Sequence, residues 1–302
     1  MSMTDQIQPK APPVLAESNL PQGQKTQGKV RDIYDCGDEL LIVTTDRLSA
    51  FDRQIALIPY KGQVLNQLSA WWFEKTKSIL PNHFIDMPDS NTMRVKKANV
   101  IPIEFVVRGY MTGSTNTSIW MRYNEGERKF DGTTFREGMR KNQQFASPLI
   151  TPTTKEADHD RPITVEEIVS QNIMTAKEWL YVSHKIVELY DFGVEVASQK
   201  GLILVDTKYE LARDENGEII LIDEIHTPDS SRYWLRDSYL ERFYAQEEPE
   251  SIDKEFLRLW FKAHCDPYHD ETLPEAPEEL VMELSRRYVQ LYEMITGKTF
   301  KR

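Results

Sequence analysis

Short apolar runs separated by turn residues dominate the first part of the chain and predict β-strands. In residues 30–45, the segments VRDIY and LLIVTT flank the turn residues 36–38, a pattern typical of a β-hairpin. Apolar residues then recur at helical spacing in 62–80, which predicts a helix. The nearly continuous apolar run 100–107 (VIPIEFVV) predicts a strand buried on both faces. We therefore expect a β-rich N-terminal lobe over residues 1–118.

The remainder of the chain, residues 119–302, mixes helical and strand patterns. Two capping boxes predict helix starts, and the pairs are Thr164 with Glu167 and Thr175 with Glu178. Near the C-terminus, one helix is expected to open at Ser251 and another to span 277–296. A larger α+β lobe that ends in helices is the expected architecture of this part.

Charged residues alternate along the strand predicted at 202–213. Asp206, Lys208 and Glu210 share one face of this strand. If the Asn-Gly pair that follows forms a two-residue turn, Glu210 lies directly opposite Asp223. Opposed carboxylates repel each other, whereas a divalent cation between them makes the interaction attractive. Magnesium often binds one or two carboxylates plus substrate phosphates. The pattern favours a metal site over its alternative, a solvated hairpin face with surface charges.

The charge balance limits the classes of partner. Lys and Arg number 37 and Asp and Glu 48, a net charge of -11, which argues against non-specific nucleic-acid binding. Two cysteines far apart imply no disulfide framework. No stretch approaches the roughly 18 apolar residues of a membrane span, and the N-terminus does not resemble a signal peptide. We expect a cytoplasmic monomer or homodimer that acts on small molecules.

A near-match to a phosphate-binding P-loop occurs at residues 23–30. Val30 replaces the hydroxyl residue that would bind magnesium, and the sequence after Lys29 predicts a strand where a P-loop requires a helix. A Gly-Lys turn that enters a hairpin can still lie over phosphates, as kinase flaps do; a surface turn with a solvated lysine is the alternative. The triplet 191–193 (DFG) lies inside a helical pattern and does not indicate a protein kinase.

Several longer motifs stand out along the chain. They are GKVRDIY (28–34), DRLSAFD (46–52), KGQVLNQLS (61–69), IPIEFVVRGYMTGS (101–114), SPLITPTTK (147–155), LVDTKYE (204–210) and DEIHTPDSSRYW (223–234). These motifs resemble those of the phosphoribosylaminoimidazole-succinocarboxamide synthase (SAICAR synthase) family. They occur in the family's order, and the C-terminal helices fit its longer form.

The resemblance implies a fold and a reaction. The expected fold is α+β and ATP-grasp-like, with the smaller lobe folding over the larger one. The expected reaction belongs to de novo purine biosynthesis: carboxyaminoimidazole ribonucleotide (CAIR), L-aspartate and ATP give SAICAR, ADP and phosphate. Because a carboxylate does not react with an amine at neutral pH, ATP would first convert it to an acyl phosphate, with magnesium offsetting the charge of the two anions.

The resemblance also assigns roles to residues within the motifs. The residues expected to bind ATP, from the flap and from the strand bordering adenine, are Gly28, Lys29 and Glu104. The expected magnesium ligands are Glu210, Asp223 and the nearby Asp206. The expected catalytic residues are Asp223 and Lys208, the latter neutralising the carboxylate that is phosphorylated.

Substrate-binding roles follow in the same way. The residues expected to hold the ribonucleotide 5′-phosphate are Arg108, Ser114 and Arg232, since a guanidinium suits bidentate phosphate binding. The alternative for each arginine is a surface salt bridge, which contributes little to stability. The residues expected to line the imidazole and aspartate sites, with individual roles left open, are Asp52, Lys155, Asp160 and Asp229.

Two other functions remain to be distinguished from the ligase. A small-molecule kinase of the same architecture would stop at phosphoryl transfer, so its ADP release would not depend on L-aspartate. A nucleotide-binding regulatory protein would be expected to lack one of Lys208, Glu210 or Asp223, and all three are present.

Overall fold

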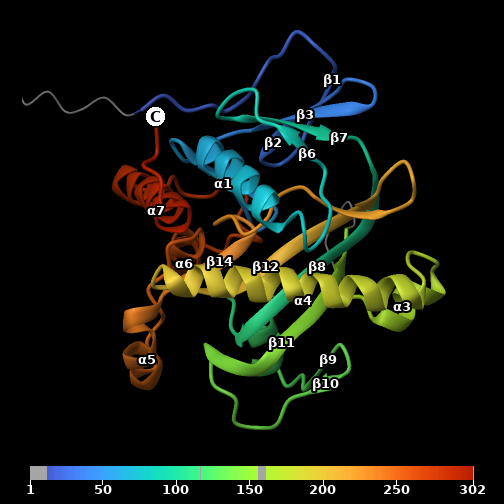
Figure 1. Cartoon of the computed structure of the whole chain (residues 1–302). Coiled ribbons are helices and arrows are strands. Elements are labelled where there is room, and N and C mark those ends of the chain that lie inside the picture. The colour runs from blue at the N-terminus through green and yellow to red at the C-terminus, as the bar shows by residue number, and fades with distance from the viewer. Residues whose placement is uncertain (1–11, 116, 156–160, 302) are drawn as a thin grey trace, which may run out of the picture.

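The computed structural model describes residues 12–115, 117–155 and 161–301, and five strands within residues 24–96 build one antiparallel sheet. The strand order is β1 (Gln24–Gln27), β2 (Arg31–Asp35), β3 (Glu39–Thr44), β7 (Thr92–Lys96) and β6 (Phe84–Asp86). The predicted hairpin is β2–β3, and the predicted helix is α1 (Lys61–Thr76), which packs on β3, β6 and β7 (Figure 1). Both predictions are confirmed. A separate ribbon joins β4 (Arg47–Ala50) to β5 (Arg53–Leu57).

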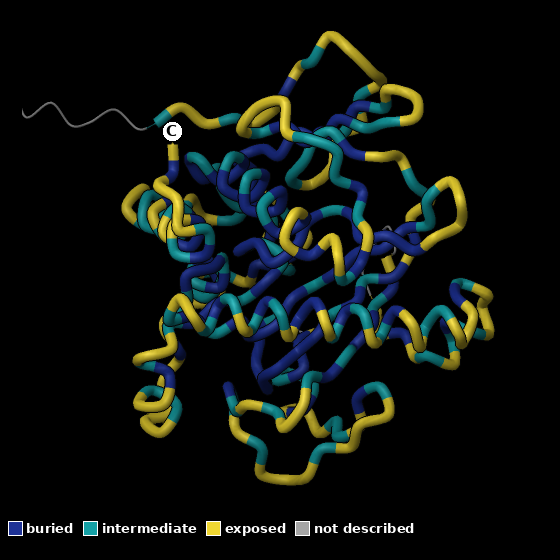
Figure 2. The backbone as a smooth tube through the Cα atoms, viewed as in Figure 1, coloured by how far each residue is buried: buried dark blue, intermediate teal, exposed yellow. Residues whose placement is uncertain are grey.

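A second antiparallel sheet forms the larger part of the molecule. Its strands run in the order β11 (Gln143–Thr154), β8 (Asn99–Met111), β12 (Leu202–Arg213) and β13 (Ile219–Ile222), and β14 (Ser231–Leu235) also pairs with β12. The long helix α4 (Ala176–Gln199) crosses one face of this sheet (Figure 1). Figure 2 shows that buried residues concentrate in these strands, while the outer loops are exposed.

Strand β8 differs from the prediction of burial on both faces. Ile103, Phe105 and Val107 are buried in the core, whereas Glu104 and Val106 between them border a cavity. The strand therefore alternates, because one face packs in the core and the other faces the cavity.

The register of the β12–β13 hairpin also differs from the prediction. Glu210 pairs with Ile222, so Asp223 comes one residue after the end of β13. The connecting loop is one residue longer than assumed: the Asp214 N–H donates to Glu218 O at 2.9 Å, and Gly217 inside the loop has φ 78°. Such a loop, with glycine in the left-handed region, shifts the pairing by one position.

The remaining helices and short strands complete the fold. They are α2 (Ile119–Asn124), β9 (Lys129–Phe130), β10 (Thr133–Thr134), α3 (Val165–Ser170), α5 (Arg236–Ala245), α6 (Glu255–His264) and α7 (Glu278–Thr296). Both predicted capping boxes are present at α3 and α4. The helix expected from Ser251 begins four residues later, because Asp253 Oδ1 accepts the Glu255 N–H at 2.7 Å. Within the described part of the chain, no helix has the length and apolar character needed to cross a membrane.

One hydrophobic core connects the two sheets. Residues of α1 such as Trp72 belong to the same buried cluster as Phe105 of β8 and Leu291 of α7. Helix α7 packs against α1, so the end of the chain returns to the first sheet (Figure 1). The division near residue 118 stays a prediction; the sheets themselves change over between β7 and β8.

Gly193 on α4 marks a close approach between this helix and the residues behind the second sheet. A Cβ at this position would lie 2.5 Å from His226 Cε1 and 2.8 Å from Leu204 Cδ2. We expect Gly193→Ala to lower the unfolding free energy by about 1–3 kcal/mol, because overpacking a dense core forces its neighbours apart. Urea denaturation measures the change, with the exposed Glu195→Ala on the same helix as control. Equal stability of the two variants would contradict this packing.

Candidate active site

A cavity of about 620 Å³ opens between the two sheets and gathers most of the predicted site residues. Those that line it are Gly28, Lys29, Asp52, Glu104, Arg108, Lys155, Asp206, Lys208, Glu210, Asp223, Asp229 and Arg232. Ser114 is buried next to the lining residue Thr115, and Asp160 lies outside the described residues. Segments that are far apart in the sequence therefore meet at one place.

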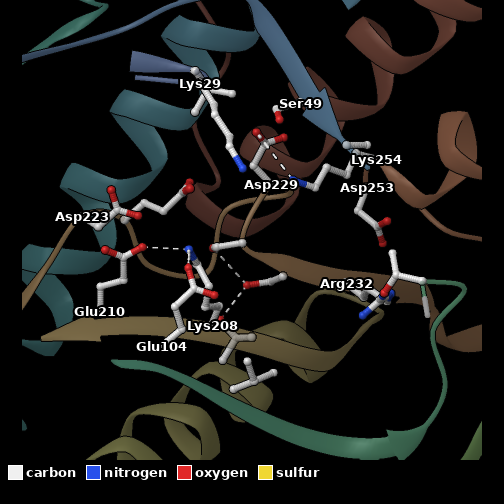
Figure 3. A pocket seen from close by; sticks show the side chains of 18 of the residues that line it. Lys29, Ser49, Glu104, Lys208, Glu210, Asp223, Asp229, Arg232, Asp253 and Lys254 are labelled. Atoms are coloured by element: carbon white, nitrogen blue, oxygen red, sulfur yellow. Dashed lines mark hydrogen bonds and ion pairs between the residues drawn. The ribbon is translucent and has the colours of Figure 1, made fainter. Parts of the chain in front are cut away.

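At one end of the cavity, Lys208 lies between two carboxylates (Figure 3). Its Nζ is 2.7 Å from both Glu104 Oε1 and Glu210 Oε1. The prediction that Asp223 lies opposite Glu210 is wrong, because Ile222 occupies that position; the carboxylate opposite Glu210 is Glu104, on the other side of β12 in the β8–β12 register. Lys155 also pairs with Glu210. Although burial opposes ionisation, Lys208 and Lys155 lower the pKa of Glu210 to about 2.

Asp223 and Glu224 receive a cation from the other sheet. Arg31 of β2 places Nη1 2.5 Å from Asp223 Oδ1 and Nη2 3.0 Å from Glu224 Oε1. Burial, together with the neighbouring carboxylates of Glu210 and Glu224, raises the pKa of Asp223 to about 6 despite Arg31. A carboxylate in this state gains from any additional nearby cation.

The carboxylates at this end of the cavity suit a hard divalent cation better than the set expected from the sequence, which also included Asp206. Oxygen ligands such as those of Glu210, Asp223 and Glu224 are what magnesium prefers. Asp206 is four residues from Glu210 along β12, about 13 Å at the usual rise per residue, and it pairs with Arg232. The structure therefore does not bring Asp206 close to Glu210 and Asp223, the other two expected ligands. In the described ranges, no group of three or more His, Cys, Asp or Glu side chains is arranged to hold a metal ion.

The opposite end of the cavity carries arginines. Arg232 Nη1 lies 2.6 Å and Arg108 Nη1 3.6 Å from Asp206 Oδ2, and Arg232 Nε lies 3.4 Å from Glu255 Oε2. Burial lowers the pKa of Arg108 to about 10, with Arg232 adding to the effect and Asp206 opposing it. Fixed guanidinium groups, buried and held by carboxylates, form a site for an anion such as a phosphate. Ser114, whose carbonyl accepts from Lys262 Nζ at 2.6 Å, belongs to the same region.

The flap residues lie at the mouth of the cavity. Lys29 precedes β2, and its Nζ is 2.6 Å from Asp52 Oδ1; the two side chains are 64% and 47% exposed. The absence of a helix after Lys29 confirms that this segment is not a P-loop. Asp52 and Phe51 both have φ near 55° in the β4–β5 turn. Left-handed backbone at two non-glycine residues is uncommon and occurs preferentially at functional sites.

The sequence did not predict several residues that line the cavity. Arg31 and Glu224 lie within recognised motifs, and this position was the signal that could have identified them as site residues. Lys254 and Arg258, on or next to α6, lie outside every recognised motif. Only the fold brings them to the cavity, where burial, with Arg258 and Lys61 adding to it and Asp229 opposing, lowers the pKa of Lys254 to about 8.

Comparison with known proteins gives consistent matches over most of the chain. The SAICAR synthetase family model matches residues 24–274. The phosphoribosylaminoimidazole-succinocarboxamide synthase of Legionella pneumophila (strain Paris) is 61% identical over 286 residues, 95% of this chain and 92% of that protein. The chloroplastic enzyme of that name from Arabidopsis thaliana is 58% identical, over 94% of this chain and 70% of its own length.

Solved structures agree in fold. The SAICAR-synthase of Saccharomyces cerevisiae, described as complexed with SAICAR, superimposes with a TM-score of 0.80 at 31% identity, covering 95% of this chain and all of that one. A type-2 SAICAR synthetase described in complex with ADP reaches 0.68 at 23% identity, which shows a shared fold.

The charged cavity in this α+β fold, together with these matches, defines the protein as an ATP-dependent ligase. The chain belongs to the SAICAR synthetase family, and it joins CAIR and aspartate in purine biosynthesis. The ligase prediction is confirmed over the small-molecule kinase and the regulatory protein.

The raised pKa of Asp223 predicts a pH-dependent stability. Its folded value of about 6 exceeds the ordinary aspartate value of about 3.9, so the group favours the folded state below about pH 4, and that contribution is lost as the pH rises through 6. In metal-free buffer, Asp223→Asn should therefore gain about 1–2 kcal/mol of unfolding free energy relative to wild type between pH 4 and pH 7. Chemical denaturation at several pH values measures this difference. The exposed Asp237→Asn is the control, and a difference that stays constant with pH would contradict the assignment.

Proposed function

We propose that the cavity activates the CAIR carboxylate as an acyl phosphate before aspartate attacks. A CAIR carboxylate oxygen attacks the γ-phosphorus of ATP, the bond to the β-γ bridging oxygen breaks, and ADP leaves. The aspartate amine then attacks the acyl carbon and loses a proton, and inorganic phosphate departs with the former carboxylate oxygen. The observation that carries this proposal is the position of Lys208, a cation fixed between two opposed carboxylates in the cavity.

Lys208 is suited to hold an anionic substrate group. Burial disfavours its charge, but Glu210 and Glu104 raise its pKa well above the ordinary lysine value, so the amine stays protonated. A permanent cation at this point offsets the repulsion between a carboxylate and the ATP phosphates. Preorganised charges of this kind provide the largest contribution to catalysis of such steps.

Magnesium is the proposed cofactor, because it needs only one or two protein carboxylates beside substrate phosphates. Glu210 and Asp223 would hold it, with Glu224 as a neighbouring carboxylate, and the raised pKa of Asp223 favours a cation there. The ion, when bound, would neutralise the β- and γ-phosphates. Arg31 of the first sheet contacts Asp223 and Glu224. It therefore already neutralises part of the negative charge that a bound magnesium ion would neutralise.

The other residues expected at the site divide between the two substrates and ATP. Gly28 and Lys29 would cover the ATP phosphates, and β8, the strand that carries Glu104, would border the adenine, a mode of binding comparable to that of ATP-grasp enzymes. The arginine end would bind the CAIR 5′-phosphate, in line with the yeast relative that is described with SAICAR. The residues proposed to contact the imidazole and aspartate are Asp52, Lys155, Asp160 and Asp229.

Replacement of Arg232 by lysine should separate substrate binding from chemistry. Arg232→Lys keeps the charge but loses the planar fork that reaches Asp206 and a bound phosphate together. The KM for CAIR should rise about tenfold or more, while kcat at saturation changes much less, since the 5′-phosphate is remote from the reacting atoms. Steady-state kinetics with varied CAIR tests this. Arg213→Lys, which pairs with Glu178 away from the cavity, is the matched control, and an unchanged KM for CAIR would refute the role.

Removal of the Lys208 charge should block phosphoryl transfer itself. Lys208→Met should bind ATP nearly normally but form ADP in a single turnover at least about 100-fold more slowly, the loss typical of a missing oxyanion donor. Rapid-quench measurement of ADP, with and without L-aspartate, checks this.

Lys185→Met on α4 controls for loss of a lysine elsewhere. A normal ADP burst in the Lys208 variant, with amide formation alone missing, would move Lys208 to the aspartate site.

A further inference from the structure

Asp229 is held from behind by two residues that do not line the cavity. Its side chain is only 3% exposed, and it follows β13 on the loop that leads into β14. Lys61 Nζ lies 2.9 Å from Asp229 Oδ2, and the Tyr288 hydroxyl donates to Asp229 Oδ1 at 2.7 Å. Each carboxylate oxygen therefore has its own partner on the protein side.

The two partners come from different helices and are completely buried. Lys61 is the first residue of α1, Tyr288 lies near the middle of α7, and both are 0% exposed. Tyr288 also lies beyond residue 274, where the family match ends. Helix α7 thus contacts Asp229, a residue of the cavity lining, through the hydroxyl of Tyr288.

The cavity side of Asp229 carries a second cation. Lys254 Nζ is 4.0 Å from Asp229 Oδ2, and both residues line the cavity (Figure 3). Although burial opposes ionisation, Lys254, Lys61 and Tyr288 hold the pKa of Asp229 well below its usual range. An anion of such low basicity is a poor proton acceptor in catalysis.

Asp229 can nevertheless accept further hydrogen bonds. Each oxygen of an ionised carboxylate has about two acceptor positions; Tyr288 uses one on Oδ1, and Lys61 forms an ion pair with Oδ2. The remaining positions are available to an N–H group in the cavity. Because both oxygens are fixed from behind, the direction of those remaining positions is fixed as well.

We propose that Tyr288 and Lys61 are positioning residues that orient the Asp229 carboxylate toward an N–H group of the bound substrate or product. The inference rests on the proposed role of Asp229 in substrate binding. It makes α7 part of the functional site, although no α7 residue lines the cavity. The Tyr288 hydroxyl then contributes to ligand affinity only through Asp229.

A double-mutant cycle tests this proposal with SAICAR as the ligand. Calorimetric titration gives the SAICAR dissociation constant for wild type, Tyr288→Phe, Asp229→Asn and the double variant. Tyr288→Phe keeps the ring in the core and removes only the hydroxyl. We expect it to weaken binding about tenfold in the wild-type background and less than twofold in the Asp229→Asn background.

Tyr292→Phe is the matched control, since this tyrosine lies one turn along α7, is largely buried and does not line the cavity. It should leave SAICAR affinity unchanged. A similar loss for Tyr288→Phe in both backgrounds, or no loss beyond that of Tyr292→Phe, would overturn the inference. If Asp229→Asn alone leaves binding unchanged, the proposed role of Asp229 fails as well.

Lys61→Met provides an independent measurement on the other oxygen. It should weaken SAICAR binding in the same direction, again only when Asp229 is present. An equal effect with and without Asp229 would assign Lys61 a purely structural role and contradict the proposal for this residue.

Discussion

The site depends on the balance of charge between β8 and β12. On one strand face, Glu210 is directly opposite Glu104, and such a pair is destabilising unless a cation lies between the two. Lys208 provides that cation from the same face of β12. Removing one partner from a partly buried ion-pair cluster leaves an uncompensated charge, which costs far more than a surface pair contributes. These matched charges stabilise the cavity, and Lys155, which also pairs with Glu210, keeps part of the balance when Lys208 is replaced.

The same strand supplies both core and chemistry because of its period of two. Tyr209 of β12 is buried and contacts His226 behind the sheet, whereas Lys208 and Glu210 on either side of it face the cavity. Four residues earlier than Glu210, Asp206 lies opposite Arg108, so this second cross-strand pair is attractive. Strand β12 thus reaches both ends of the cavity. Near Lys208 and Glu210 the cavity is suited to a metal and phosphoryl transfer, and near Asp206 it is suited to a substrate anion.

Local patterns were sufficient for much of the fold and for part of the site. The hairpin β2–β3, the helix α1 and both capping boxes follow from short-range chemistry, and the prediction that Lys208 and Glu210 share a face follows from strand periodicity. The recognised motifs added most of the remaining lining residues.

The failures have physical causes that short-range patterns do not contain. The length of a hairpin loop decided the register at Asp223, so Ile222 of β13 lies opposite Glu210 on that side of β12. The carboxylate opposite Glu210 is Glu104, on the other neighbouring strand, β8. Lys254 reaches the cavity because α6, which it precedes, packs against α7, and Tyr288 reaches Asp229 because α7 returns to α1. Contacts between segments this far apart in the sequence leave no local signature.

Transfer of a carboxylate oxygen to phosphate is the most direct measurement of the central claim, that this charged strand face activates the CAIR carboxylate. CAIR labelled with ¹⁸O in both carboxylate oxygens is converted with ATP and L-aspartate, and the inorganic phosphate and SAICAR are analysed by mass spectrometry. Our account predicts one ¹⁸O in each phosphate released and one in the amide carbonyl of SAICAR. Phosphate without the label would contradict it, because ATP would then have been cleaved by water and no acyl phosphate would have formed.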